Sequence, residues 1–531
     1  ENRKPLIDEG NVIPTGPTVS ENNGQKAQNR TYQDLLKDKN DEFNFEQLAL
    51  STIYKITLEG EKTLWKKTAL HRSMSFSPDG EYVMLTTVER PFSYLVPYYR
   101  FPSKTEMYSK DGQFIKSVLE VPLIEDLPKG FNAVRTGMRN VSWRNDKPAT
   151  IYWVEALDGG DPANEVDYRD AVYQQAAPFE ADKQLLLKTH NRFSGIRWGD
   201  DDLAVAYDYW WSNRNTKTYL FNPSDSEQDP TIISDRNYQD RYSDPGDFVT
   251  QENELGQSVL VQNDGKLYLI GDGYSDEGIR PFVDAFDVKS QQTERLYQAD
   301  GKTTLENISR AIDMEKGIVL SRIQSKTDYP NYYFRNIKTG KLTQITDFDN
   351  PFKAMEEVHK ELITYKRDDG VELSATLYLP PNYDRAEKEK LPMIMWAYPR
   401  EYKDKSSAGQ ITSSSNEFTY PYYGSPIYWV LKGYAVLDDT AFPIIGEGEK
   451  EPNDSFRKQL VANGKAAIDV VDEMGYIDRN KVAVGGHSYG AFMTANLLSH
   501  SNLFAAGIAR SGAYNRTLTP FGFQAEERSY W

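Results

Sequence analysis

Residues 486–490, near the carboxyl end of the chain, have the types and spacing of a serine nucleophile. They read Gly-His-Ser-Tyr-Gly, with the short apolar run 482–484 before them and the helix-forming run 491–498 after them. A strand that turns at once into a helix needs a tight, strained corner, and flanking glycines let neighbouring backbone approach it closely. The pattern predicts that Ser488 holds its hydroxyl at the carboxyl end of a sheet. A Gly/Ser turn that only links two elements is the alternative.

The groups that would activate this serine are not found after it. A serine nucleophile needs a base and an acid that orients the base, and in a strand–serine–helix fold both follow the serine. The histidine that follows Ser488 is His500, which lies about three turns along the expected helix, roughly 18 Å away at 1.5 Å per residue. His359 lies in a linker and is a weak candidate. We therefore expect either that the base and acid lie outside this chain or that the protein hydrolyses nothing.

Two groups could stabilise the negative charge that forms when a serine attacks a carbonyl. The first is the backbone N–H of Tyr489, the residue after the nucleophile. The second is the phenol of Tyr398, which follows an expected buried strand at residues 392–397. Tyr398 could instead be an aromatic residue at a strand end that only packs.

Alternating strands and helices are expected to position these groups. Such alternation is typical of a mostly parallel sheet, whose site lies at the carboxyl ends of its strands. The expected strands are 361–365 and 372–379 (a hairpin), 392–397, 434–437, 482–484 and 503–509, with an amphipathic helix over 454–474.

The preceding part of the chain repeats a different unit. About five strand–turn–strand units recur from residue 74 to 346 at spacings of roughly 45 to 65 residues, after a partial unit. Short strands in series favour the blades of a β-propeller over a two-sheet sandwich. Residues 1–48 are polar and predict a loop with a short helix near 32–37. We therefore predict a β-propeller domain at 1–350 and an α/β-hydrolase domain at 351–531.

Composition excludes several classes of function. The 62 basic and 79 acidic residues give a net charge of −17, which argues against nucleic acid as a partner. The chain has no cysteine, which excludes disulfides and zinc–thiolate sites. No run approaches the length of a membrane span, and the polar N-terminus lacks a signal-peptide core. We expect no cofactor and no metal, we suspect a periplasmic or secreted location, and we leave open a homo-oligomer.

Residues 443–449, 485–498 and 507–524, with 32–38 and 90–97, resemble the prolyl oligopeptidase family of serine peptidases, and within it the glutamyl endopeptidase-like branch. The resemblance runs over nearly the whole chain. It implies a β-propeller that caps an α/β-hydrolase domain, with the active site between them and a peptide as substrate. It also implies that both domains are partial here, because relatives extend past both ends.

The resemblance assigns roles to individual residues. It implies that Ser488 is the nucleophile and that Tyr398 and the Tyr489 amide form the oxyanion hole. The segment 511–516 falls where the family builds the pocket for the residue before the cut. The residues expected to line that pocket are Ser511, Tyr514 and Arg516, with Arg510 and Arg400 as weaker candidates.

The branch also implies a preference for glutamate, or aspartate, before the cut. A carboxylate taken into a closed cavity needs a fixed cation, and the bidentate fork of arginine suits it better than lysine. Arg516 is the first candidate, unless it pairs with an acidic residue at 526 or 527. Two other functions stay open, a catalytically inactive propeller that binds peptides and a carboxylesterase. The polar pocket segment argues against the esterase, because ester pockets are usually apolar.

Overall fold

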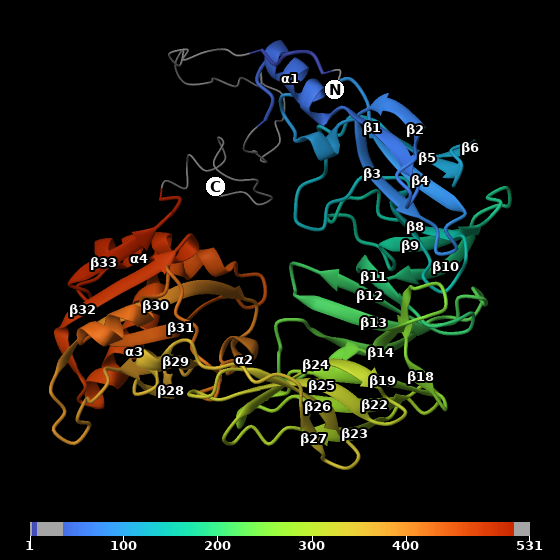
Figure 1. The fold of residues 1–531 in the computed structure, drawn as a ribbon. Coiled ribbons are helices and arrows are strands. Elements are labelled where there is room, and N and C mark those ends of the chain that lie inside the picture. The colour runs from blue at the N-terminus through green and yellow to red at the C-terminus, as the bar shows by residue number, and fades with distance from the viewer. Residues whose placement is uncertain (1–2, 8–34, 515–531) are drawn as a thin grey trace.

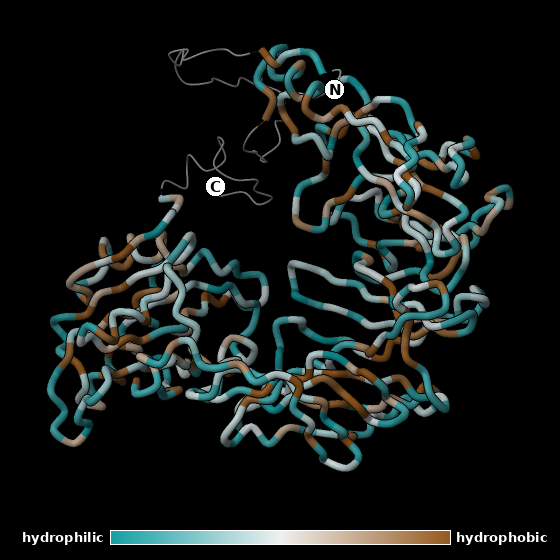
Figure 2. The backbone as a smooth tube through the Cα atoms, in the orientation of Figure 1, coloured by the Kyte–Doolittle hydropathy of each residue, from teal (hydrophilic) through white to brown (hydrophobic). Residues whose placement is uncertain are grey.

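The computed structural model describes residues 3–7 and 35–514 of the chain. A series of antiparallel sheets follows an open arc from the N-terminal side, and a mixed α/β sheet lies at the other end of that arc (Figure 1). Hydrophobic stretches lie mainly along the strands, whereas the loops between them are mostly hydrophilic (Figure 2). This organisation agrees with the predicted propeller followed by a hydrolase domain.

Five antiparallel sheets of four or five strands, which we call blades 1 to 5, lie between residues 71 and 344 of the described chain. A two-stranded sheet, β1 (Ser51–Ile56) with β2 (Lys62–Ala69), precedes them. These sheets match the predicted five units and the partial unit before them. A turn of the predicted type joins the first two strands of blade 1, where Gly80 has φ +73° and the Ser77 hydroxyl donates to Asp79.

The strands of the blades are as follows. Blade 1 has β3 (His71–Phe76), β4 (Tyr82–Val88), β5 (Ser103–Ser109) and β6 (Phe114–Val121). Blade 2 has β7 (Arg139–Trp143), β8 (Thr150–Ala156), β9 (Asp170–Ala176) and β10 (Gln184–Thr189). Blade 3 has β11 (Arg192–Trp198), β12 (Ala204–Trp210), β13 (Asn215–Phe221) and β14 (Thr231–Asn237). Blade 4 has β15 (Asp247–Phe248), β18 (Gln262–Asn263), β19 (Lys266–Gly271), β22 (Phe282–Asp287) and β23 (Thr293–Gln298). Blade 5 has β24 (Leu305–Asp313), β25 (Ile318–Gln324), β26 (Asn331–Asn336) and β27 (Leu342–Gln344). Two short hairpins, β16 (Thr250–Glu252) with β17 (Ser258–Leu260) and β20 (Tyr274–Ser275) with β21 (Gly278–Ile279), accompany blade 4.

Apolar side chains join each blade to the next. Blades 1 and 2 share a cluster that includes Met107 and Trp153, and blades 2 and 3 share one that includes Val172 and Phe193. Similar clusters join blade 3 to blade 4 and blade 4 to blade 5. The sheets therefore pack face to face along the arc, as blades of a propeller do.

The C-terminal part has one six-stranded sheet in the order β28-β29-β31-β30-β32-β33. Its strands are β28 (His359–Lys366), β29 (Glu372–Leu379), β30 (Leu391–Tyr402), β31 (Ala435–Ile445), β32 (Ile477–His487) and β33 (Ala506–Arg510). The pairs among β30 to β33 are parallel, and β28 and β29 form the predicted antiparallel hairpin. The helices are α2 (Lys405–Ala408), α3 (Phe456–Glu473) and α4 (Tyr489–His500), and the 3₁₀ turns are Lys353–Met355, Pro426–Lys432 and Pro452–Ser455. Leu460, Ile468 and Val471 of α3 are buried against the sheet.

The N-terminal helix differs from its prediction. Helix α1 spans Lys39–Ala49, whereas the short helix was expected near residues 32–37, of which 35–37 are not helical and 32–34 lie outside the described residues. The Asp38 side chain accepts hydrogen bonds from the backbone N–H groups of Asn40 and Asp41 and so fixes the helix start. A further 3₁₀ turn, Tyr98–Arg100, lies before β5. Every helix within residues 35–514 is too short or too polar to span a membrane.

Candidate active site

Ser488 occupies a strained corner between strand β32 and helix α4. Its φ is 56° and its ψ is −112°, a left-handed conformation that costs a residue with a Cβ on the order of 1–3 kcal/mol. Its N–H donates to the Arg510 carbonyl at 2.8 Å, and its own carbonyl accepts from the Ala491 N–H at 3.0 Å. The neighbouring strand and the first turn of α4 therefore hold Ser488 in a conformation that it would not adopt alone.

The glycines on both sides of Ser488 are needed because the strand β30 passes very close to them. A Cβ at Gly486 would lie 2.6 Å from the Ala397 carbonyl oxygen, and a Cβ at Gly490 would also lie 2.6 Å from it. Both distances are shorter than real Cβ contacts. The close approach that the sequence pattern predicted thus involves the Ala397 carbonyl, which precedes Tyr398, and for Gly486 also the backbone of Gly490 at 2.6 Å.

Tyr398 lies beside a cleft of about 790 Å³. Its side chain is 50% exposed, and its ring centroid is 6.1 Å from that of Tyr489. The Tyr489 ring itself stacks on Phe456, and its hydroxyl donates to Glu401 at 3.3 Å. The Tyr489 backbone begins helix α4, next to Ser488. Because Tyr398 follows the carbonyl that touches the glycines, the cleft and the serine corner share strand β30.

The other side of the cleft comes from blades 3 and 4 of the propeller. Gln239, Arg241 and Tyr274 line it. Direct hydrogen bonds hold the two parts together here, since Gln239 Nε2 donates to the Glu401 carbonyl at 2.7 Å and Gln410 Nε2 donates to Asp240 at 2.6 Å. Sequence reasoning missed this wall, because no motif marks a loop that faces a strand more than a hundred residues away.

The arginines proposed for substrate binding lie in different places. Arg400 is exposed and lines the cleft with Tyr398. Arg510 lies at the end of β33, and its Nη1 donates to the Gly424 carbonyl at 3.0 Å while its guanidinium lies 5.8 Å from the Tyr423 ring centroid. Arg516 lies outside the described residues. Of the three, Arg400 is the one that the described structure places in the cleft.

Two other residues of the predicted pocket, Ser511 and Tyr514, follow the end of β33. Ser511 has φ 55°, and Tyr514 is 50% exposed with its hydroxyl donating to the Ala509 carbonyl at 3.3 Å. Neither is among the residues that line the cleft.

A pair of adjacent carboxylates in the cleft was not foreseen. Asp438 and Asp439 of β31 both line it, and Asp439 has φ 50°. Burial, followed by the charge of Asp439, raises the pKa of Asp438 to about 6. Burial lowers the pKa of the nearby Lys360 to about 8. The Asp-Asp dipeptide was visible in the sequence, but only the fold places it at the cleft.

Of the described histidines, three form hydrogen bonds elsewhere, His500 lies far along helix α4, and His487 ends β32 directly before Ser488. His71, His190 and His359 contact Lys67, Asp167 and Glu361 respectively. His500 is the last of the twelve residues of helix α4, on the helix where it was predicted to lie. No hydrogen bond between a histidine and Ser488 is found in residues 35–514, and the position of the base stays a prediction.

Comparison with known proteins finds a peptidase family and two plant relatives. Residues 457–525 match the prolyl oligopeptidase family model. The chain is 42% identical over 536 residues to "Probable glutamyl endopeptidase, chloroplastic" of Oryza sativa subsp. japonica, covering 98% of this chain and 57% of that protein. It is 42% identical over 538 residues to the protein of the same name from Arabidopsis thaliana, covering 98% of this chain and 56% of that protein. The chain therefore spans little more than half the length of these relatives.

The fold is also similar to that of a solved peptidase. An acylaminoacyl peptidase in complex with Z-Gly-Gly-Phe-chloromethyl ketone superposes with a TM-score of 0.50 at 16% identity, over 87% of this chain and 66% of that one. Residues 457–525 therefore carry a prolyl oligopeptidase family domain, and the chain is similar over nearly its whole length to two proteins named as probable glutamyl endopeptidases.

Proposed function

We propose that this chain carries the nucleophile and the oxyanion-binding groups of a serine endopeptidase that cuts peptides after glutamate. The observation that carries the proposal is the corner at Ser488, which is strained and pressed against strand β30 next to the cleft. Strain that the surrounding structure enforces is typical of functional sites. The names of the two plant relatives support the choice of glutamate.

In this proposal the Ser488 oxygen attacks the carbonyl carbon of the scissile peptide bond, and the serine proton passes to a base. The carbonyl oxygen becomes negative and accepts hydrogen bonds from the Tyr398 hydroxyl and the Tyr489 amide. When the C–N bond breaks, the amine leaves with a proton and the acyl group stays on Ser488. Water then releases the acid product. The position of Tyr398 at the cleft supports its role as donor.

We propose Arg400 as the cation that recognises the glutamate side chain. It lines the same cleft as Tyr398, two residues away along β30, and no ion pair between Arg400 and a carboxylate is found in residues 35–514. Arg241, across the cleft, is already paired with Asp272 at 3.1 Å. A fixed guanidinium beside a half-enclosed site would offset the cost of taking a carboxylate out of water. Arg516 stays a second candidate.

The nucleophile is tested by labelling the full-length protein with a fluorophosphonate probe and assaying a glutamyl reporter peptide. Ser488→Ala should lose both labelling and cleavage. Ser499→Ala, an exposed serine on the same helix whose hydroxyl donates to the Ala495 carbonyl, should keep both. Unlabelled wild-type protein would favour an inactive binding protein, and turnover of esters without turnover of peptides would favour an esterase.

The cation is tested with a matched pair of substrates that carry Glu or Gln before the cut. Arg400→Gln should lower kcat/KM for the Glu peptide by about 10–100-fold and leave the Gln peptide nearly unchanged, since a hydrogen bond to a charged group is worth about 1.5–3 kcal/mol. An unchanged Glu/Gln ratio would remove Arg400 from this role and leave Arg516 to be tested.

The proposal also includes the domain division. We place the boundary between propeller and hydrolase domain at residues 350–351, in the segment between β27 and β28 that contains one 3₁₀ turn. Limited proteolysis of this segment, followed by mass spectrometry, should release fragments that correspond to the two domains.

A further inference from the structure

A second pocket, of about 620 Å³, lies between blade 1 and blade 2. Residues of all four blade 1 strands line it on one side, and residues 139–142 of β7 line it on the other. None of its lining residues belongs to the cleft beside Tyr398. It is therefore a separate site.

The pocket exists because the face of blade 1 that lines it carries small polar side chains. Ser73 pairs with Thr86, and Thr86 pairs with Thr105, so that three short side chains lie in one row across β3, β4 and β5. The Thr86 and Thr105 hydroxyls are 2.9 Å apart and hydrogen-bonded to each other. Elsewhere on the same interface, Met107 and Trp153 fill the space between the two blades. Short side chains where neighbouring positions carry large ones leave a cavity lined by hydroxyl groups.

Three arginines line this pocket, and none of its lining residues is Asp or Glu. Arg72 is exposed, and its Nη1 donates to the Tyr99 carbonyl at 3.4 Å. Arg135 is half-buried and donates to the backbone carbonyls of Thr136 and Met138. Within residues 35–514 no carboxylate is paired with Arg135. Burial, followed by the charge of Arg139, lowers the pKa of Arg135.

Arg139 is the most buried of the three. Its exposed fraction is 7%, and neither Nε nor Nη2 has a hydrogen-bond partner among the described residues, although Nη2 forms an ion pair with Asp170. Asp170 is shared, because its Oδ1 also accepts from Arg192 at 3.1 Å and its Oδ2 accepts from the Phe193 N–H at 2.9 Å. Arg139 therefore shares its carboxylate with Arg192, and its buried Nε has no hydrogen-bond partner among the described residues.

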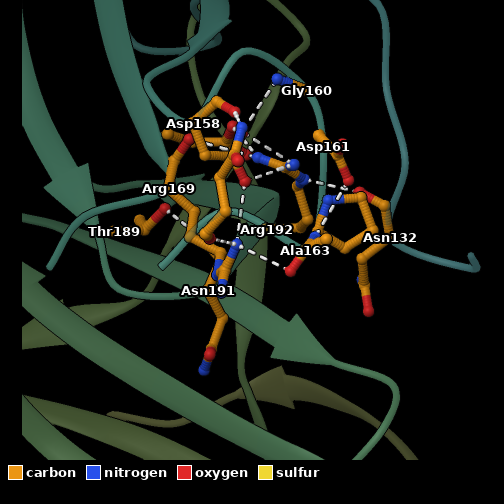
Figure 3. Close-up of polar contacts among 12 residues, drawn as sticks. Asn132, Asp158, Gly160, Asp161, Ala163, Arg169, Thr189, Asn191 and Arg192 are labelled. Carbon is orange, nitrogen blue, oxygen red and sulfur yellow. Dashed lines mark hydrogen bonds and ion pairs between the residues drawn. The ribbon is translucent and has the colours of Figure 1, made fainter. Parts of the chain in front are cut away.

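The neighbouring charge network cannot supply the missing anion. Arg169 and Arg192 converge on Asp158, as Figure 3 shows, with Arg192 Nη2 2.7 Å and Arg169 Nη1 2.9 Å from Asp158 Oδ2. Two buried carboxylates, Asp158 and Asp170, thus serve Arg139, Arg169 and Arg192. Buried charges are normally paired, so an excess of cations next to a cavity indicates a place for an anion.

We propose that the pocket between blades 1 and 2 binds a small oxyanion ligand, with one or more carboxylate or phosphate groups held by Arg135 and Arg139 and by the serine and threonine hydroxyls. Guanidinium groups match both kinds of oxyanion bidentately. The chain as a whole carries −17, so its general field repels anions, and binding there requires a built site. This site is independent of the peptidase proposal, because none of its residues contacts Ser488 or lines the cleft.

Isothermal titration calorimetry of the full-length protein at low ionic strength tests the proposal, with citrate and inorganic phosphate as probes. We expect saturable binding of at least one probe and about tenfold weaker binding in Arg135→Gln, since one charge-assisted hydrogen bond is worth about that factor. Arg72→Gln, at an exposed position where the fold is not at risk, should weaken binding by a smaller factor. Arg310→Gln, an exposed arginine of blade 5 outside the pocket, is the matched control and should bind as the wild type does.

The two probes distinguish the source of the oxyanion. Tighter binding of citrate assigns the site to carboxylates, and tighter binding of phosphate assigns it to phosphates. The proposal is overturned if neither probe binds saturably, or if Arg135→Gln and Arg72→Gln both bind as tightly as Arg310→Gln.

Discussion

Replacement of Gly490 by alanine tests whether the corner at Ser488 depends on close contact with strand β30. The new Cβ would lie 2.6 Å from the Ala397 carbonyl oxygen, against 3.4 Å or more for an ordinary contact, so one side must move by about 0.8 Å. Strand β30 is paired on both sides, with Trp396 opposite Gly485 and Ala397 opposite Thr440. The serine corner is therefore the part that must shift.

Two opposing effects set the cost in stability. Overpacking of this kind costs typically about 1–3 kcal/mol. Alanine in place of glycine in a helix gains about 0.5–1 kcal/mol, because Gly490 is part of α4 and its φ is not positive. We expect a net loss of about 1–2 kcal/mol, which lowers the Tm of a domain of this size by about 2–8 °C. A displacement close to 1 Å at a catalytic group can cost about 10²-fold in rate.

The assay combines thermal unfolding with the rate at which a fluorophosphonate probe labels Ser488. Gly490→Ala should show the lower Tm and a labelling rate reduced by about 10–100-fold. Gly195→Ala is the matched control, since a Cβ there meets nothing within 4 Å, and it should leave both quantities unchanged. If Gly490→Ala unfolds and labels as the wild type does, the contact with Ala397 does not hold the corner and the reasoning fails.

Two further changes probe the cleft. Tyr398→Phe should lower kcat on a glutamyl peptide by about 10²–10³-fold, because the lost hydroxyl is an oxyanion donor. The Tm should change little, because the side chain is half exposed. A change in KM with kcat unaltered would contradict this role. Asp438→Asn should raise stability above pH 6. Because the folded pKa of Asp438 is raised to about 6 from 3.8, its contribution to stability is fully present below the unfolded value and falls by about 3 kcal/mol as pH rises through 6. A Tm difference between variant and wild type that does not grow from pH 4 to pH 8 would exclude this burial effect.

Local patterns in the sequence determined a large part of the fold. The run from residue 482 to 498 combines an apolar strand, a Gly-x-Ser-x-Gly corner and a helix, and each of these depends on neighbours in the chain. Turn signals such as Ser77 to Gly80 likewise mark where a blade strand ends, because a turn is a local structure. The order of blades followed by an α/β sheet could therefore be read without coordinates.

Other features depended on contacts between distant segments. Arg400 and Arg510 are alike as residues, yet Arg400 lines the cleft and Arg510 contacts Gly424. The cleft wall at Arg241 and the unpaired charge of Arg135 have no sequence signal either. The positions of these arginines depend on which sheet faces and loops pack together. The burial of apolar surface over the whole chain sets this packing. The strained serine and its flanking strand and helix follow from local sequence, because each depends on residues close together in the chain. Which arginines line a cavity and which are paired with neighbours depends on tertiary packing.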